Sequence, residues 1–80
     1  MKDDLLNAIA LALEDQWDAA HRIVQQYDAD RTAAWIHAVL HKIEGDLANS
    51  RYWYRQAGTM ECVDREPLAE LRDIEAALGG

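Results

Sequence analysis

The chain has 80 residues, half of them hydrophobic, and a formal net charge of −7 at pH 7. This length supports one domain with a thin core, and the hydrophobic share is too high for a disordered chain. A strongly acidic protein is a poor ligand for nucleic acid or for an anionic membrane, because neutralising phosphates requires lysine and arginine.

The charge is unevenly distributed along the chain. Residues 1–30 sum to −5, residues 31–60 to +2 and residues 61–80 to −4. The mildly basic middle is suited to meet the acidic ends, either within one fold or between two copies of the chain. A mixed solvated surface is the simpler interpretation.

Cysteine usage and hydropathy predict the compartment. Cys62 is the sole cysteine, so no disulfide can form within the chain. The N-terminal residues lack the apolar run of a secretory signal, and no segment reaches the length of a membrane span. We therefore expect a protein of a reducing compartment, most simply the cytoplasm, with neither a membrane nor a nucleic acid as partner.

Hydrophobic spacing predicts two helices in the first third of the chain. The first covers residues 3–14, where Asp3 or Asp4 is suited to cap the first turn. A tight joint at residues 15–16 separates it from a second helix over residues 17–27. The core positions of the second helix are three or four residues apart: Trp17, Ala20, Val24 and Tyr27.

The next two helices are predicted over residues 31–44 and 47–57. Asp30 and Asp46 each precede a helix, where an aspartate side chain can accept hydrogen bonds from free backbone N–H groups. Gly45 lies where the earlier helix ends, and glycine has no Cβ to oppose a left-handed conformation there. The short joint makes the two helices antiparallel neighbours.

The last predicted helix covers residues 66–78, after a loose stretch at residues 59–65, with Pro67 in its first turn. The other four helices form two hairpins. Stacked helical repeats expose apolar faces at their ends, so we expect the last helix to cap the stack. The predicted fold class is all-α, with two antiparallel helical hairpins and a C-terminal capping helix in a single domain over residues 1–80.

A repeated pattern relates residues 8–24 to residues 38–54, thirty residues further on. Matching positions carry residues of similar character: Ala8 and Ala38, Glu14 and Glu44, Trp17 and Leu47, Ala20 and Ser50, Val24 and Tyr54. A fixed period in this range is typical of stacked helical hairpins. The small residues are predicted to let paired helices approach each other closely.

The second copy of this pattern resembles a tetratricopeptide repeat. The positions that carry the resemblance are Gly45 and Asp46 at the turn, Ser50 as the small residue, Tyr54 as the aromatic residue and Ala57 as the alanine. Residues 53–57 also resemble a Sel1-like repeat, and the Tyr-Trp-Tyr-Arg run resembles small bacterial proteins. The resemblance implies two repeats, over residues 3–28 and 31–57, and a role in binding other proteins.

One stripe of the predicted third helix carries His37, His41 and Glu44, at spacings of four and three residues. Two histidines one turn apart can bind a divalent metal ion, with Glu44 as a candidate third ligand and His21 as a candidate fourth. The alternative interpretation is a polar flank packed by tyrosine or arginine partners, since the chain has no HExxH motif.

An aromatic and basic segment covers residues 51–55. Arg51 and Arg55 share a helix face and could clamp a carboxylate or a phosphate, with Tyr52 beside them. Alternatively, the aromatic residues 53–54 belong to the core and the arginines pair with nearby acidic side chains.

No nucleophile–base pair and no cofactor motif is visible, so the sequence predicts a non-enzymatic protein without a cofactor. The leading predicted function is a helical protein–protein interaction module, whose partner is another protein or a second copy of the chain in a homodimer. Its candidate contact residues are Trp35, Val39, Lys42, Arg51, Tyr52 and Arg55. The alternative function is binding of a metal ion or small ligand by His37, His41 and Glu44.

Overall fold

The computed structural model describes residues 1–79, which form five α-helices and one short 3₁₀-helix and contain no strand. The elements in chain order are α1 (Lys2–Leu13), α2 (Trp17–Gln25), α3 (Arg31–Glu44), α4 (Leu47–Ala57), η1 (Met60–Cys62) and α5 (Pro67–Ala77). The all-α prediction is confirmed, and α2 ends two residues earlier than expected. None of these helices is both long enough and apolar enough to cross a membrane.

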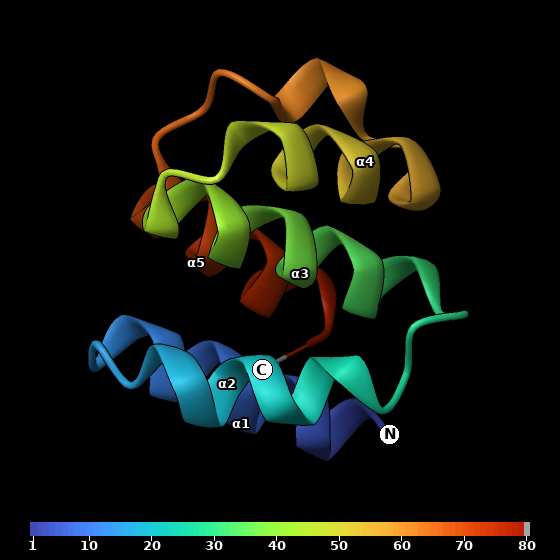
Figure 1. Ribbon diagram of the computed structural model, residues 1–80. Helices are drawn as coiled ribbons and strands as arrows, with labels where there is room; N and C mark the ends of the chain where they lie inside the picture. Colours follow the sequence, from blue (N-terminus) through green and yellow to red (C-terminus); the bar gives the residue numbers. More distant parts are fainter. Residues whose placement is uncertain (80) are drawn as a thin grey trace.

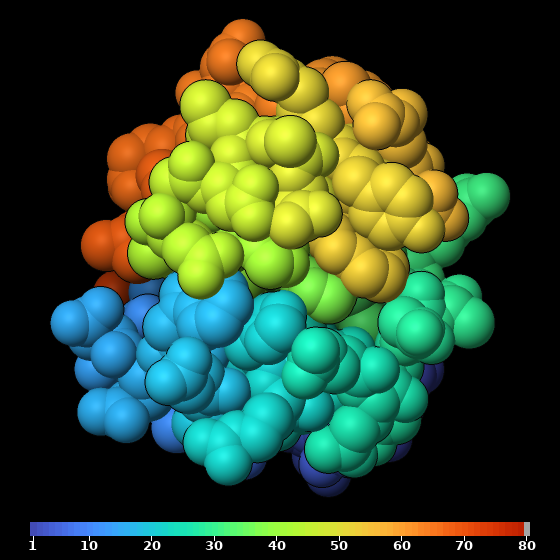
Figure 2. Space-filling view, in the orientation of Figure 1, coloured from blue at the N-terminus to red at the C-terminus, as the bar shows by residue number. Residues whose placement is uncertain are grey.

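The helices are arranged in two pairs. Helix α1 packs mainly against α2, and α3 packs mainly against α4. Figure 1 shows the α1/α2 pair below the α3/α4 pair, with α5 behind α3. In the space-filling view of Figure 2, the side chains of the two pairs meet along a closed seam, so the pairs form one body.

Helix α5 connects the two pairs. It packs against α3 of one pair and α1 of the other, with Leu71 and Ile74 fully buried. The expectation that this helix caps one end of a stack is therefore wrong. The first helices of the two pairs both contact α5, which removes the apolar side chains Leu71 and Ile74 from water.

The joint between α3 and α4 has the predicted geometry. Asp46 accepts a hydrogen bond from the backbone N–H of Asn49 at 3.3 Å, and Asp30 caps α3 in the same way. Gly45 ends α3 with φ +88°, and Gly58 ends α4 with φ +74°. Glycine adopts these left-handed angles without strain, so each helix stops where the sequence predicts.

The start of α1 differs from the prediction. The helix begins at Lys2, so Asp3 and Asp4 lie inside its first turn and neither side chain caps it. Their negative charges still favour this end of the helix, where unpaired N–H groups carry partial positive charge. Asp4 also accepts a hydrogen bond from the hydroxyl of Tyr27, which connects the start of α1 to the turn that follows α2.

Small residues line the contacts within each pair, as the repeated pattern predicts. Ala8, Ala20 and Ala38 are fully buried. Ser50 is buried as well, and its hydroxyl donates a hydrogen bond of 2.8 Å to the backbone carbonyl of Ala38. This bond satisfies the one polar atom that serine brings into the α3/α4 contact.

Candidate functional site

The predicted contact residues divide between the interior and the surface. Val39 is fully buried, so the folded chain cannot offer it to a partner. The indole of Trp35 and the ammonium of Lys42 are both hydrogen-bonded to the buried carboxylate of Glu70. Val39 is therefore removed from the predicted contact set, whereas Trp35 and Lys42 are partly buried and already bonded to Glu70.

Glu70 organises a polar network that the sequence did not reveal. Its side chain has no exposed surface, and its carboxylate accepts hydrogen bonds from Trp35 at 2.7 Å, Lys42 at 2.8 Å and Tyr54 at 2.8 Å. Lys42 also donates to backbone carbonyls in residues 62–65. A buried carboxylate requires such partners, so this network attaches α5 and the preceding segment to the α3/α4 pair.

The remaining predicted contacts are Arg51, Tyr52 and Arg55. Together with Ala48 they form what we call the α4 face. These four side chains are exposed, and their spacing places them on one side of the helix. Among residues 1–79, neither arginine has a carboxylate oxygen within ion-pairing distance. The alternative in which the arginines pair with neighbouring acidic residues is therefore not observed in this part of the chain.

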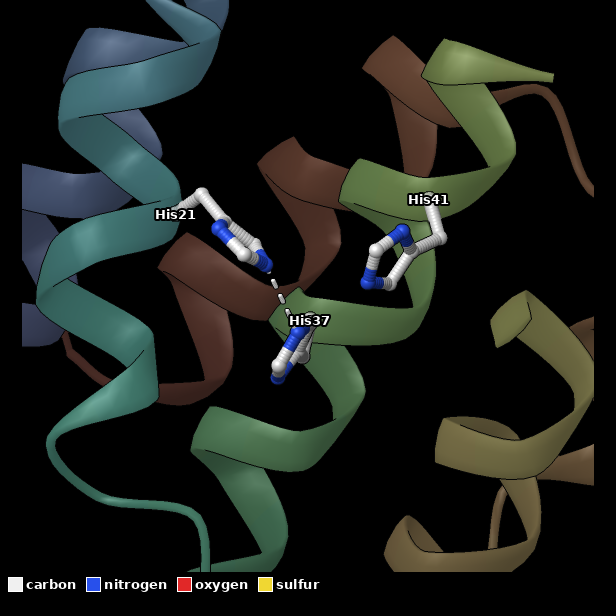
Figure 3. Close-up of side chains that lie close together, drawn as sticks. All are labelled: His21, His37 and His41. Carbon is white, nitrogen blue, oxygen red and sulfur yellow. Dashed lines mark hydrogen bonds between the residues drawn. The ribbon is translucent and has the colours of Figure 1, made fainter. Parts of the chain in front are cut away.

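Three histidines form a second feature, the histidine cluster: His21 of α2 with His37 and His41 of α3. Nε2 of His21 lies 3.0 Å from Nε2 of His37, at hydrogen-bond distance. One nitrogen from each ring lies within 4.8 Å of the other two. Figure 3 shows the three rings converging between the two helices. His37 and His41 are buried, at 5% and 9% exposed, and His21 is partly exposed.

Two tryptophans hold the rings of the cluster. Trp17 stacks on His21 with 4.6 Å between ring centroids, and Trp53 stacks on His37 at 4.0 Å. Trp17 is itself fixed by a hydrogen bond of 2.6 Å from Nε1 to the carbonyl of Leu40. The indoles therefore restrict ring rotation and keep water from two sides of the cluster.

Glu44 lies beside the cluster and not among the converging nitrogens. Its Oε1 lies 3.1 Å from Nδ1 of His41, while its side chain remains partly exposed. This hydrogen bond orients the His41 ring and places the proton on Nδ1. Figure 3 shows the other nitrogen of His41 on the side facing His21 and His37. Glu44 thus lies beside His41 outside the three-histidine cluster, and with His41 and Asp46 it forms a second group of possible ligand atoms.

Burial favours the neutral forms of His37 and His21. Desolvation, followed by the nearby His21 and His41, lowers the pKa of His37 to about 3. Desolvation is also the main cause that lowers the pKa of His21, with His41 second. Within residues 1–79, the buried Nδ1 of His37 has no hydrogen-bond partner. At neutral pH the His21 and His37 rings are therefore neutral, and the buried His37 retains one unsatisfied polar atom.

Comparisons with known proteins place this geometry in no family. No protein-family model, no curated protein and no solved structure matches the chain. The α4 face and the histidine cluster are therefore interpreted from their own chemistry.

Proposed function

We propose that the protein is a helical protein–protein interaction module that binds an acidic segment of another protein through the α4 face. The observation that carries this proposal is that Arg51 and Arg55, on either side of Tyr52, are exposed and have no ion-pair partner among residues 1–79. Arginine and tyrosine are the residues most enriched among the side chains that dominate binding energy.

The charge distribution favours an acidic partner. Helix α4 carries +2 and no acidic residue, whereas the rest of the chain carries −9, which together give the net charge of −7. An acidic segment is thus attracted to α4 and repelled elsewhere, which fixes where it binds. A symmetric contact between the α4 faces of two copies would place arginines opposite each other, which disfavours self-association through this face.

The arrangement of the helices is compatible with this role. Helix α4 packs mainly against α3 and η1, and Figure 2 shows its gold side chains at the surface of the upper half. The resemblance of residues 31–57 to a tetratricopeptide repeat supports the same class of function. Because α5 covers α1 and α3, the outer side of α4 is the more accessible surface for a partner.

The test is binding of a fluorescent, glutamate-rich helical peptide, followed by fluorescence anisotropy at low and high salt. We expect binding that weakens with salt, and a loss of about tenfold in the R51E/R55E variant, since each exposed charge contact contributes up to about 1 kcal/mol. A lysine-rich peptide of the same length is attracted to the acidic remainder of the chain, so its binding should not weaken in the R51E/R55E variant.

The matched control is the R22E/R72E variant, which changes the net charge equally at exposed arginines outside the α4 face. It should retain most of the affinity. Equal losses in the two double variants would show a general charge effect and contradict a defined face, as would the absence of binding to the acidic peptide at low salt.

A further inference from the structure

We propose that His21, His37 and His41 together bind one divalent transition-metal ion of the zinc type, each through one ring nitrogen. This site is separate from the α4 face and does not depend on the interaction proposed there. It joins the two helical pairs, because His21 belongs to α2 and the other two histidines belong to α3.

The distances suit a single ion. Zinc binds imidazole nitrogens at about 2.0–2.1 Å, so two nitrogens of a tetrahedral site lie about 3.3 Å apart. Nε2 of His21 and Nε2 of His37 are already 3.0 Å apart. The third nitrogen lies within 4.8 Å of both, so it must approach by about 1.5 Å at most.

The type of ligand determines the class of metal. Three imidazoles and no thiolate suit ions such as Zn²⁺, Co²⁺, Ni²⁺ and Cu²⁺, whereas Mg²⁺ and Ca²⁺ prefer oxygen ligands. Cys62, the sole cysteine, lies in η1 and is not a member of the cluster. The ion is therefore held by neutral nitrogens, with Glu44 nearby as a source of compensating negative charge.

The surroundings of the rings resemble the support that metal-binding histidines require. A carboxylate that accepts the second N–H of a ligating histidine fixes the ring orientation and raises the basicity of the other nitrogen. Glu44 makes such a contact with Nδ1 of His41 at 3.1 Å. The indoles of Trp17 and Trp53 hold the other two rings by stacking. All three ligands are therefore oriented before an ion arrives.

The experiment titrates chelator-treated protein with Zn²⁺ by isothermal calorimetry and with Co²⁺ by visible absorption. We expect one ion per chain with a dissociation constant in the micromolar range or below, and intense Co²⁺ bands typical of a tetrahedral site. H21Q, H37Q and H41Q should each weaken Zn²⁺ binding at least a hundredfold. E44Q should weaken it by about 10-fold to 100-fold, since Glu44 acts through His41.

The matched control is D28N, which removes an exposed carboxylate that belongs to no group of possible metal ligands and should leave Zn²⁺ affinity unchanged. Circular dichroism of each variant establishes that it is folded, and H21Q alters the least buried of the three rings. Absence of binding below millimolar Zn²⁺, full affinity in folded H21Q, or a weak octahedral Co²⁺ spectrum would each overturn the assignment.

Discussion

His37 is the side chain whose chemistry depends most on the fold. It is enclosed by the rings of His21, His41 and Trp53, and burial lowers its pKa to about 3. In the unfolded chain the pKa returns to about 6.5. Between these two values the unfolded chain binds more protons than the folded one, so stability must rise with pH across this interval.

The metal-free protein should therefore lose stability on acidification below about pH 6.5, by up to about 1.4 kcal/mol per pH unit from His37 alone. Urea unfolding between about pH 7 and pH 5.5, in the presence of a chelator, measures this slope. The folded H37Q variant lacks the titrating ring and should show a smaller slope. Identical slopes in the two proteins would contradict a neutral, buried His37.

The residue features that the sequence predicts correctly are those that depend on a single turn of helix. Asp46 as a cap, Gly45 in a left-handed conformation and the pairing of His37 with His41 all follow from local spacing. Glu70 was missed, because its position in the α5 pattern is that of an ordinary surface glutamate. Its burial depends on Lys42, twenty-eight residues away, and no local pattern reports such a pairing.

Helix α5 shows how a single buried charge can attach an entire element. Leu71 and Ile74 provide its apolar contact, while Glu70 provides the polar one. Truncating one partner of a buried ion pair leaves the other charge uncompensated, which typically costs about 3–5 kcal/mol. The apolar residues supply area, and Glu70 with Lys42 fixes the register in which α5 lies.

The E70L variant should lower the free energy of unfolding by about 3–5 kcal/mol, because the Lys42 ammonium loses its carboxylate partner. Urea unfolding monitored by circular dichroism measures the change. The E70L/K42M variant removes both charges and should recover a large part of the loss. A single variant as stable as the natural chain would show that the ion pair does not hold α5.

The same element explains a prediction that failed. The amphipathic pattern of residues 66–78 correctly predicted a helix. The repeated pattern in the preceding residues led us to expect this helix at the end of a stack. Its actual position depends on the shape of the surface that α1 and α3 form together, which arises only once both pairs are folded. The existence of a helix is locally encoded in the sequence, whereas its docking site depends on contacts between distant segments.

At the scale of the molecule, the two pairs are held together by α5 on one side and by α2 against α3 on the other. A chain of this size has a thin core, so the free energy that one of these contacts contributes is a large fraction of the free energy of unfolding. The fold is therefore expected to unfold as a single unit, with α5 included in the cooperative transition.

Removing α5 tests that cooperativity. A fragment of residues 1–65 exposes the apolar sides of α1 and α3 and leaves Lys42 without Glu70, so it should show no sigmoidal urea transition by circular dichroism. Adding a synthetic peptide of residues 66–80 at high concentration should restore helical signal. A fragment that unfolds cooperatively at the midpoint of the full chain would contradict the bridging role of α5.

The stacking of Trp17 on His21 and of Trp53 on His37 gives the chain built-in optical probes. Indole emission responds to the electronic state of a ring in contact with it, so an arriving ion or proton changes the emission of these two residues. Trp35 is hydrogen-bonded to Glu70 away from the imidazoles and supplies a constant background. A W35F protein would thus report the occupancy of the cluster by its own fluorescence, without an added dye.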